Sequence, residues 1–375
     1  MQFTVSSKKL FTKLQAAAQV INKKNTLPIL DCFLLGLRGN ILNIASTDGE
    51  VRLVTKVEVQ DAEGDIKVAV NAQTLVGALK ELPDQPITFE VNENNFEIFI
   101  HYHNGKFNFI GQSADDYPTP RLLDEKVKQE LTIDADVLLN GIGGTLFAVA
   151  DDELRPVMNG IYFDITNKDV TFVASDGHRL IKLASNVAKG TEQSSFILPT
   201  KGATIITKLL AKQSDPVRVR FDFNNAVFDL TDYSVTVRFI DGRYPNYNSV
   251  IPENNSNKFT ISKSSLSAII KRVSVFANEK SNLVKFDISN NALLVSAQDI
   301  DYSTSAEEST EISYDGTPMQ IGFKSAFLID QLDNIQSDEV ELQLSDPSRA
   351  ALIVPISGGS GWDSTYLLMP MQLNG

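Results

Sequence analysis

The sequence is poor in the residue types that build covalently stabilised or redox-active sites. Its 375 residues include one cysteine, Cys32, one tryptophan and three histidines. A single cysteine excludes an internal disulfide and a zinc cage made of cysteines. No stretch approaches 18 consecutive apolar residues, and the first residues lack the apolar run of a signal peptide. We therefore expect a cytoplasmic protein that neither spans nor binds a membrane.

Positive charge is also scarce. The chain has 34 Lys and Arg residues against 47 Asp and Glu residues, a formal net charge of −13, which by itself argues against a protein that coats nucleic acid. The charge is unevenly distributed, because residues 7–24, which we expect to be helical, are basic, whereas residues 132–153 are acidic. Taken together, the expected helices are basic and the rest of the chain is acidic. A basic helical face can hold a polyanion, but lysine is equally common on solvated helix faces.

One pattern occurs three times along the chain. Similar four-residue strand starts stand at Phe3, Leu131 and Phe259, which are equally spaced, and each leads into a segment with apolar residues at helical spacing. The segment 46–49 likewise recurs as 174–177. Repeats of this length indicate duplicated domains. We predict three homologous domains, residues 1–128, 129–256 and 257–375.

Each domain is expected to have the same α+β architecture. Alternating apolar and polar segments separated by Asn-containing turns predict antiparallel strands, and two helical patterns per domain predict two helices that pack on the sheets. Gly141, Gly143 and Gly144 lie inside one expected helix, where glycine costs about 1 kcal/mol relative to alanine. Close packing and close approach of a ligand would both explain them.

The segment Ser175-Asp176-Gly177-His178-Arg179-Leu180 has the residue types of a hydrolytic site. However, members of a catalytic triad meet across a fold, whereas neighbouring residues on an extended strand point to opposite faces. The repeat offers a better explanation, in which Asp-Gly forms a turn and the three residues after it are specific to the second domain.

Other patterns point to no catalytic, metal or cofactor site. His101 and His103 are two residues apart but have no accompanying ligands, so an exposed hairpin is the better interpretation. The run 151–153 is acidic, as solvated loops often are, and no phosphate-binding glycine motif is present. The C-terminal segment from Tyr366 to Leu373 is apolar and predicts a last strand, while methionines beside a proline also suit an adaptable peptide groove.

Several of these motifs, in this order and spacing, resemble a known family. They are the opening MQFTV with a lysine-rich helix, TLPIL from Thr26, Asn159-Gly160, SDGHRL from Ser175, DGRYP from Asp241, NEK from Asn278 and Met369-Pro370-Met371. Over the whole chain the sequence resembles the bacterial sliding clamp, the β subunit of DNA polymerase III. The resemblance implies a non-catalytic subunit of a DNA-directed DNA polymerase, without cofactor, that forms a head-to-tail homodimeric ring around double-stranded DNA, whatever its sequence, and makes the polymerase processive.

The resemblance also implies three sets of site residues. The residues expected to contact DNA are Lys9, Lys13, Lys24, Arg155, Lys201 and Lys271. The dimer interface is expected to bring Phe107 and Phe109 of one chain against Val275 and Phe276 of the other. The groove for peptides of the polymerase III α subunit, the clamp loader δ subunit and other clamp-motif proteins would include Met158, Ser175, Gly177, His178, Arg179, Leu180, Pro245, Val250, Phe327, Leu367, Met369, Pro370 and Met371.

The sequence departs from the family at some of these places. Lys24 stands where the family has an arginine, and Asp152, Pro156 and Val157 stand where other members have a glutamine and two tyrosines that touch DNA. Ser249 replaces a basic residue and Ser281 an aromatic one near the expected groove. Two alternatives from other classes remain at this point: a scaffold of repeated domains that does not bind DNA, and a hydrolase that depends on His178.

Overall fold

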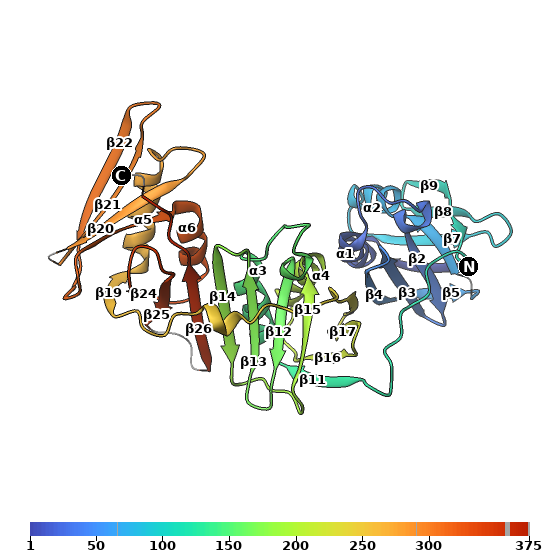
Figure 1. The fold of residues 1–375 in the computed structure, drawn as a ribbon. Helices are drawn as coiled ribbons and strands as arrows, with labels where there is room; N and C mark the ends of the chain where they lie inside the picture. The colour runs from blue at the N-terminus through green and yellow to red at the C-terminus, as the bar shows by residue number, and fades with distance from the viewer. Residues whose placement is uncertain (66, 290, 357–360, 374–375) are drawn as a thin grey trace. The chain divides into compact units, whose positions relative to one another are not determined.

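The chain forms two compact units. The computed structural model describes residues 1–65, 67–289, 291–356 and 361–373. One unit comprises residues 1–136 and 204–239, and the other comprises residues 137–203 and 240–375 (Figure 1). The division does not follow the sequence repeat, because the middle repeat contributes strands to both units.

The first unit contains two antiparallel sheets. Along the described chain, the five-stranded sheet has the order β5 (Gln60–Glu63), β1 (Gln2–Ser6), β7 (Pro86–Val91), β8 (Glu97–Tyr102) and β9 (Gly105–Ile110). The nine-stranded sheet has the order β10 (Gln112–Ser113), β6 (Lys67–Asn71), β2 (Cys32–Arg38), β3 (Ile41–Thr47), β4 (Val51–Glu58), β18 (Tyr233–Arg238), β17 (Asn225–Asp229), β16 (Val217–Phe221) and β11 (Gln129–Ile133). The pairing of β4 with β18 joins strands of the first and second repeats.

The second unit is built in the same way from two further antiparallel sheets. Within the residues described, the eight-stranded sheet has the order β15 (Ser194–Pro199), β12 (Gly160–Ile165), β13 (Val170–Ser175), β14 (Arg179–Ser185), β26 (Trp362–Leu368), β25 (Ala351–Pro355), β24 (Glu339–Leu344) and β19 (Asn257–Ser262). The four-stranded sheet has the order β22 (Thr304–Glu311), β21 (Ala292–Asp299), β20 (Leu283–Ser289) and β23 (Met319–Lys324). Here β14 and β26 join strands of the second and third repeats.

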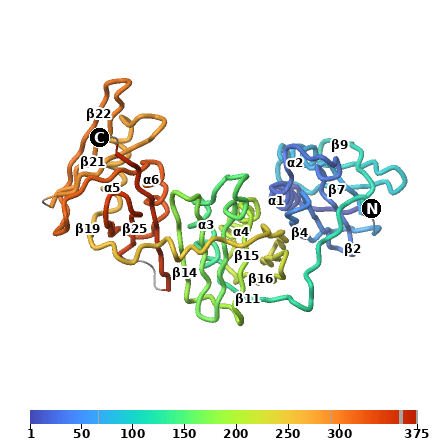
Figure 2. The backbone as a smooth tube through the Cα atoms, in the orientation of Figure 1, coloured from blue at the N-terminus to red at the C-terminus, as the bar shows by residue number. Residues whose placement is uncertain are grey.

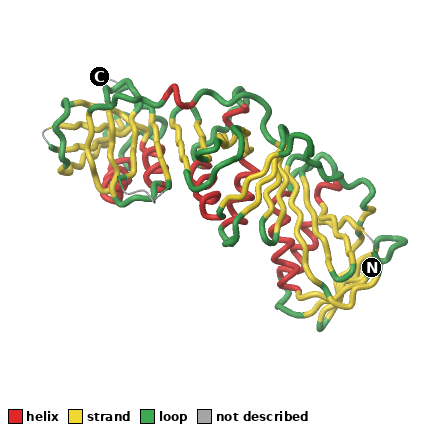
Figure 3. Tube along the Cα trace, turned by 90° about the horizontal axis from the view of Figure 1, so that it is seen from below, coloured by secondary structure: helices red, strands yellow, loops and turns green. Residues whose placement is uncertain are grey.

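In the part of the chain that the structure describes, each repeat contributes two helices. They are α1 (Ser7–Ala17), α2 (Ala72–Lys80), α3 (Ala135–Leu146), α4 (Thr200–Leu210), α5 (Lys263–Ser274) and α6 (Ser325–Asn334). Short 3-10 turns lie at Ala18–Val20, Pro28–Asp31, Pro156–Met158 and Tyr247–Val250. Figure 3 shows the helices lying against the sheets within each unit, and the whole backbone can be followed in Figure 2. The predicted α+β architecture with two helices per repeat is confirmed.

The repeated strand starts fix where the helices begin. Ser6 and Ser262 end the strand segments of the first and third repeats, and each accepts a hydrogen bond from the backbone N–H three residues on, at Lys9 and Ser265. Such N-caps satisfy a backbone donor that has no partner within the helix. The first helix is shorter than predicted, because α1 ends at Ala17 and a 3-10 turn follows. Lys23 and Lys24 therefore lie on a loop and not on the helix.

The packing explains two glycines of α3. A Cβ atom at Gly141 would lie 2.4 Å from the ring of Phe172, and one at Gly144 would lie 2.6 Å from Leu183 Cδ1. Both neighbours come from buried strand positions of the second unit. Of the two explanations that the sequence left open for these glycines, the structure supports close packing of the helix on the sheet.

Candidate partner-binding surface and DNA-binding residues

The segment from Ser175 to Arg179 is a tight turn closed by its own side chains. Ser175 Oγ donates to the Arg179 carbonyl at 2.7 Å and accepts from the Gly177 N–H at 3.1 Å. Asp176 Oδ1 accepts from the N–H groups of His178 and Arg179, both at 2.9 Å. Gly177 has a φ of +89°, which is unfavourable for residues with a Cβ atom. Asp-Gly therefore does form a turn, as the repeat predicted.

This turn leaves no hydrolytic triad at His178. The Ser175 hydroxyl bonds to backbone atoms, and the imidazole of His178 instead stacks on the ring of Phe327, with centroids 6.1 Å apart. A nucleophile needs a base within hydrogen-bond reach. The hydrolase alternative is thus wrong for this turn.

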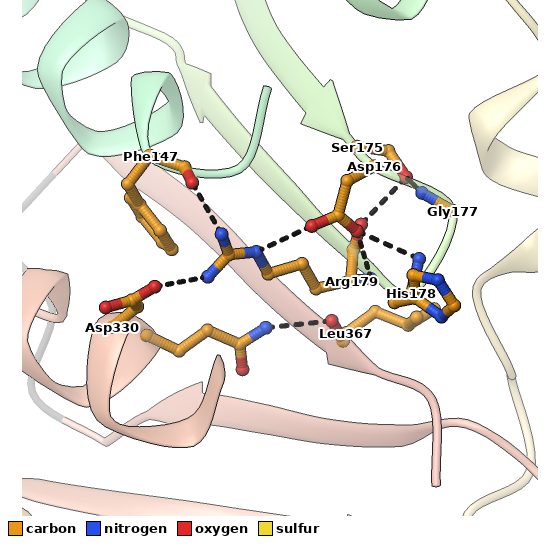
Figure 4. Close-up of polar contacts among 9 residues, drawn as sticks. Phe147, Ser175, Asp176, Gly177, His178, Arg179, Asp330 and Leu367 are labelled. Atoms are coloured by element: carbon orange, nitrogen blue, oxygen red, sulfur yellow. Dashed lines mark hydrogen bonds and ion pairs between the residues drawn. The ribbon is translucent and has the colours of Figure 1, made fainter. Parts of the chain in front are cut away.

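Arg179 connects the turn to two helices of the second unit (Figure 4). Its guanidinium donates to Asp176 at 3.0 Å, to Asp330 on α6 at 2.7 Å and to the Phe147 carbonyl just after α3 at 2.7 Å. Its Cζ atom also lies 4.4 Å from the centroid of the Phe327 ring. The side chain is only 9% exposed, so these contacts compensate for the burial of its charge.

The C-terminal segment reaches the same turn. Strand β26 pairs with β14 so that Leu367 lies opposite Leu180. After β26 ends, the Met369 N–H donates to the His178 carbonyl and the Met371 N–H donates to the Gly322 carbonyl, both at 2.8 Å. Gln331, fully buried on α6, donates to the Leu367 carbonyl at 2.9 Å. The predicted last strand is confirmed, and it brings Met369, Pro370 and Met371 beside the turn.

An apolar cluster lies under this region. Its buried members are Val173, Leu180, Ile197, Tyr244, Tyr247, Ala350, Leu352 and Leu367. Val157, beside the buried Met158, packs against it. On the same unit Pro245 is exposed, Val250 is 56% exposed and Met369 is 41% exposed. Exposed apolar residues beside a buried apolar cluster are typical of a surface that a partner covers.

Two tyrosines contribute aromatic rings to the cluster. Tyr247 donates to Asp164 Oδ2 at 2.9 Å while its ring stays among the apolar residues, and Tyr244 stacks on Tyr162 with centroids 4.8 Å apart. Burial raises the pKa of both phenols, and the bond to Asp164 adds to the shift for Tyr247. Both side chains therefore remain neutral at physiological pH and present aromatic faces.

Five lysines of the first unit line a cavity of about 660 Å³. Its lysines are Lys9, Lys13, Lys56, Lys208 and Lys212. Lys13 already has partners, because its Nζ lies 3.0 Å from Asp232 and 4.7 Å from the centroid of the Tyr233 ring, and the side chain is 15% exposed. Among the residues described, Lys9, Lys56, Lys208 and Lys212 form no ion pair. Lys56, Lys208 and Lys212 were not among the residues that the sequence predicted to contact DNA.

The other predicted DNA-contacting residues differ in their surroundings. Lys24 is exposed on the loop after the first 3-10 turn, and Lys201 is half-buried on α4. Arg155 pairs with Asp152 at 2.8 Å, and its hydrogen bond holds the pKa of that carboxyl below its usual value. Lys271 pairs with Asp333 of α6 at 3.1 Å. Exposed pairs of this kind are weak and can exchange for a phosphate.

The predicted dimer residues lie at sheet edges or beside a helix end. Phe107 and Phe109 are half-buried on β9, the last strand of its sheet. Val275 and Phe276 directly follow α5 and are 77% and 40% exposed. Strand β22 forms an edge of the four-stranded sheet, and Arg272 of α5 pairs with its Glu308 at 2.6 Å. Unpaired edges of this kind can accept another strand.

The sequence could not reveal which residues hold Arg179. Phe147 and Asp330 have no motif of their own, and they reach Arg179 only because α6 and the end of α3 lie beside the turn. Over the described ranges no group of His, Cys, Asp or Glu side chains could hold a metal ion. No helix among those described is long and apolar enough to cross a membrane.

Three family models match the chain in succession. They are the N-terminal domain of the DNA polymerase III beta subunit at residues 1–122, its central domain at residues 132–246 and its C-terminal domain at residues 248–372. The beta sliding clamps of Vibrio cholerae and Escherichia coli K12 are each 27% identical to the chain, and each match covers 100% of both chains. A Pseudomonas aeruginosa sliding clamp bound to griselimycin superimposes with a TM-score of 0.93 at 28% identity, again over 100% of both chains.

Three α+β repeats, together with these full-length matches, define a non-catalytic clamp that makes a replicative DNA polymerase processive. The chain belongs to the family of bacterial β sliding clamps, the β subunit of DNA polymerase III. The family and the non-enzymatic function inferred from the sequence are thereby confirmed.

Proposed function

We propose that two copies of the chain close head to tail into a ring around double-stranded DNA. The three predicted domains, 1–128, 129–256 and 257–375, would give six domains per ring. Phe107 and Phe109 would pack against Val275 and Phe276 of the second copy, and the edge strands β9 and β22 would pair across the contact. The exposure of Val275 and Phe276 and the two free sheet edges among the described strands support this contact. A head-to-tail contact that closes after two steps gives a ring.

We further propose that the basic residues hold the DNA through its phosphates. Lys9, Lys24 and the cavity residues Lys56, Lys208 and Lys212 would make these contacts. Lys13, Lys201, Arg155 and Lys271 would join them, once Asp232, Asp152 and Asp333 are displaced from Lys13, Arg155 and Lys271. Contacts to phosphates carry no sequence information, so the ring would slide. The protein would act in the cytoplasm, where the chromosome is replicated.

The apolar cluster and its exposed rim are proposed to bind short peptides of the polymerase III α subunit, the clamp loader δ subunit and other clamp-motif proteins. The observation that carries this proposal is the convergence of Phe327 and Met369, from distant parts of the chain, on His178, two residues before Leu180 of the cluster. An apolar peptide side chain would cover the cluster, and His178 and Arg179 would border it. Tethering a polymerase in this way raises its effective concentration at the primer end.

The ring is tested by topology. The protein is loaded by an active clamp loader onto nicked circular DNA, half of the sample is linearised, and the protein retained at high salt is measured. Retention on circles with loss from linear DNA is expected, because screened phosphate contacts alone cannot distinguish the two DNAs. The variant Phe276→Asp, which would break the proposed contact, should be lost from both. Equal loss of the wild type from both DNAs would contradict the ring and favour the scaffold alternative.

A further inference from the structure

The turn that borders the proposed peptide site has a close counterpart in the first unit. Thr47 Oγ1 donates to the Val51 carbonyl at 2.8 Å and accepts from the Gly49 N–H at 3.1 Å. Asp48 Oδ1 accepts from the N–H groups of Glu50 and Val51 at 2.9 and 2.7 Å. These are the same four hydrogen bonds, in the same order, as those of the turn at Ser175. Gly49 also has a positive φ, +96°, like Gly177.

The strand pairing beside the two turns is equivalent as well. In the second unit, Leu180 of β14 lies opposite Leu367 of β26, and both belong to the apolar cluster. In the first unit, Arg52 of β4 lies opposite Thr236 of β18. Arg52 pairs with Thr47 on its other side as Leu180 pairs with Ser175. The sheet therefore places Arg52 and Thr236 where the proposed peptide site has two leucines.

A Tyr-Pro pair completes the correspondence. Tyr244, before Pro245, packs in the apolar cluster, while Tyr117, before Pro118, packs with Cys32 and Ala69 in a smaller cluster. Arg52 lies across this smaller cluster. Its guanidinium donates to the Pro118 carbonyl at 2.8 Å, and its Cζ is 5.7 Å from the centroid of the Tyr117 ring.

Arg52 has an unusual environment for a cation. Among the residues described it forms no ion pair, and its Nε is buried with no hydrogen-bond partner. Burial lowers the pKa of the guanidinium. An unpaired, partly buried cation is costly, so stability alone does not explain an arginine at a position where the repeat tolerates leucine.

We infer that Arg52 closes a second peptide site between β4 and β18, so that each chain presents one apolar peptide site instead of two. This inference rests on the peptide site proposed above. The long side chain would cover Tyr117 and reach the Pro118 carbonyl, whereas the shorter Leu180 leaves the surface beside Tyr244 and Pro245 open. One site per chain would make partners compete for it.

The number of bound peptides tests the inference. The probe is a fluorescein-labelled decapeptide with an adjacent Leu-Phe pair, titrated into the full-length protein by calorimetry and anisotropy. The wild type should bind one peptide per chain. The variant Arg52→Leu/Thr236→Leu, which rebuilds the leucine pair, should bind two, whereas the matched variant Arg52→Lys/Thr236→Leu, which keeps a long cation, should bind one.

A folded Arg52→Leu/Thr236→Leu protein that still binds one peptide, or a wild type that binds two, would overturn the inference. If that variant does not fold, the reciprocal variant Leu180→Arg decides. Its arginine should reach the Pro245 carbonyl and lower the affinity for the labelled peptide at least tenfold. An unchanged peptide affinity would show that an arginine at this position does not close the site. A wild type that binds no peptide at all would instead contradict the proposed peptide site itself.

Discussion

Arg179 lies over the ring of Phe327 and is held there from both sides. Its Cζ is 4.4 Å from the ring centroid, and the same guanidinium bonds to Asp330 on α6 and to the Phe147 carbonyl after α3. A single side chain thus fixes the turn at Ser175 relative to both helices. The planar fork of arginine is needed for this, because it donates in several directions at once.

We expect Arg179→Lys to weaken peptide binding about tenfold, which corresponds to about 1.4 kcal/mol. A lysine keeps the charge but cannot donate to Asp176, Asp330 and Phe147 together. Urea unfolding should show a loss of about 2 kcal/mol in the free energy of unfolding, the usual value for hydrogen bonds to a charged group. Arg121→Lys, at a side chain 38% exposed, serves as the control and should change neither quantity. Peptide affinity equal to that of the wild type would show that Arg179 does not position the site.

The C-terminal segment provides a second test of the peptide site. A chain that ends at Leu368 loses Met369, Pro370 and Met371 but keeps strand β26 intact. We expect its peptide affinity to fall more than tenfold, because one side of the proposed site is removed, while its Tm falls by only a few degrees. A chain that ends at Leu373 is the control and should bind like the wild type. Undiminished binding by the shorter chain would exclude these residues from the site.

Lys9 and Lys13 should contribute differently to DNA binding. For a short linear duplex, Lys9→Ala should reduce the slope of log K against log salt by about 1, as expected for one lost phosphate contact. Lys13→Ala should have a smaller effect, because Lys13 is already paired with Asp232. Asp232→Asn should strengthen binding by freeing Lys13. Anisotropy over a series of salt concentrations measures all three, and equal slopes for the two alanine variants would contradict this assignment.

Glycines at two helix positions should respond in opposite ways to alanine. Gly141→Ala places a Cβ against the Phe172 ring, and overpacking of this kind typically costs about 1–3 kcal/mol. A Cβ at Gly77, on α2, would have no described atom within 4 Å apart from its chain neighbours and its own helix backbone, so Gly77→Ala should stabilise the protein by about 1 kcal/mol. Thermal and urea unfolding of the two variants measure the change in stability of each. Stabilisation by Gly141→Ala would show that the helix can move away from the sheet.

Stability should fall at alkaline pH because of buried tyrosines. Burial raises the pKa of Tyr117 to about 12, while its hydroxyl donates to the carbonyls of Cys32 and Ala45. The unfolded state releases this proton near pH 10 and the folded state does not. The stabilisation is therefore complete below about pH 10 and is lost as the pH rises toward 12.

Urea unfolding at several pH values measures this loss of stability above pH 10. The variant Tyr117→Phe should show a smaller alkaline decrease in the free energy of unfolding, and at neutral pH its free energy of unfolding should be lower by about 1 kcal/mol. Tyr302→Phe, at a side chain 78% exposed, is the control and should keep the wild-type profile. A Tyr117→Phe protein with an unchanged alkaline decline would show that other groups cause it.

Local patterns in the sequence were enough to predict the architecture. The strand starts that end in Ser6 and Ser262 cap helices through bonds to residues three positions away, and Asp176-Gly177 closes its turn through bonds within five residues. Interactions of this kind depend on neighbouring residues, so they are visible in the order of the amino acids. The three repeats, the antiparallel sheets and the last strand could be predicted for the same reason.

Contacts between distant parts of the chain could not be predicted in this way. Three such contacts depend on how the helices pack on the sheets. Lys13 pairs with Asp232, and Gly141 leaves room for Phe172. Arg179 is held by Phe147 and Asp330. The same repeat position holds Leu180 in one unit and Arg52 in the other, and only the folded surroundings show that one lies in an apolar cluster while the other reaches across to Pro118. The order of residues thus specified the elements and their turns, whereas three-dimensional packing determined which side chains remain available to a partner, because burial and pairing are properties of the assembled fold.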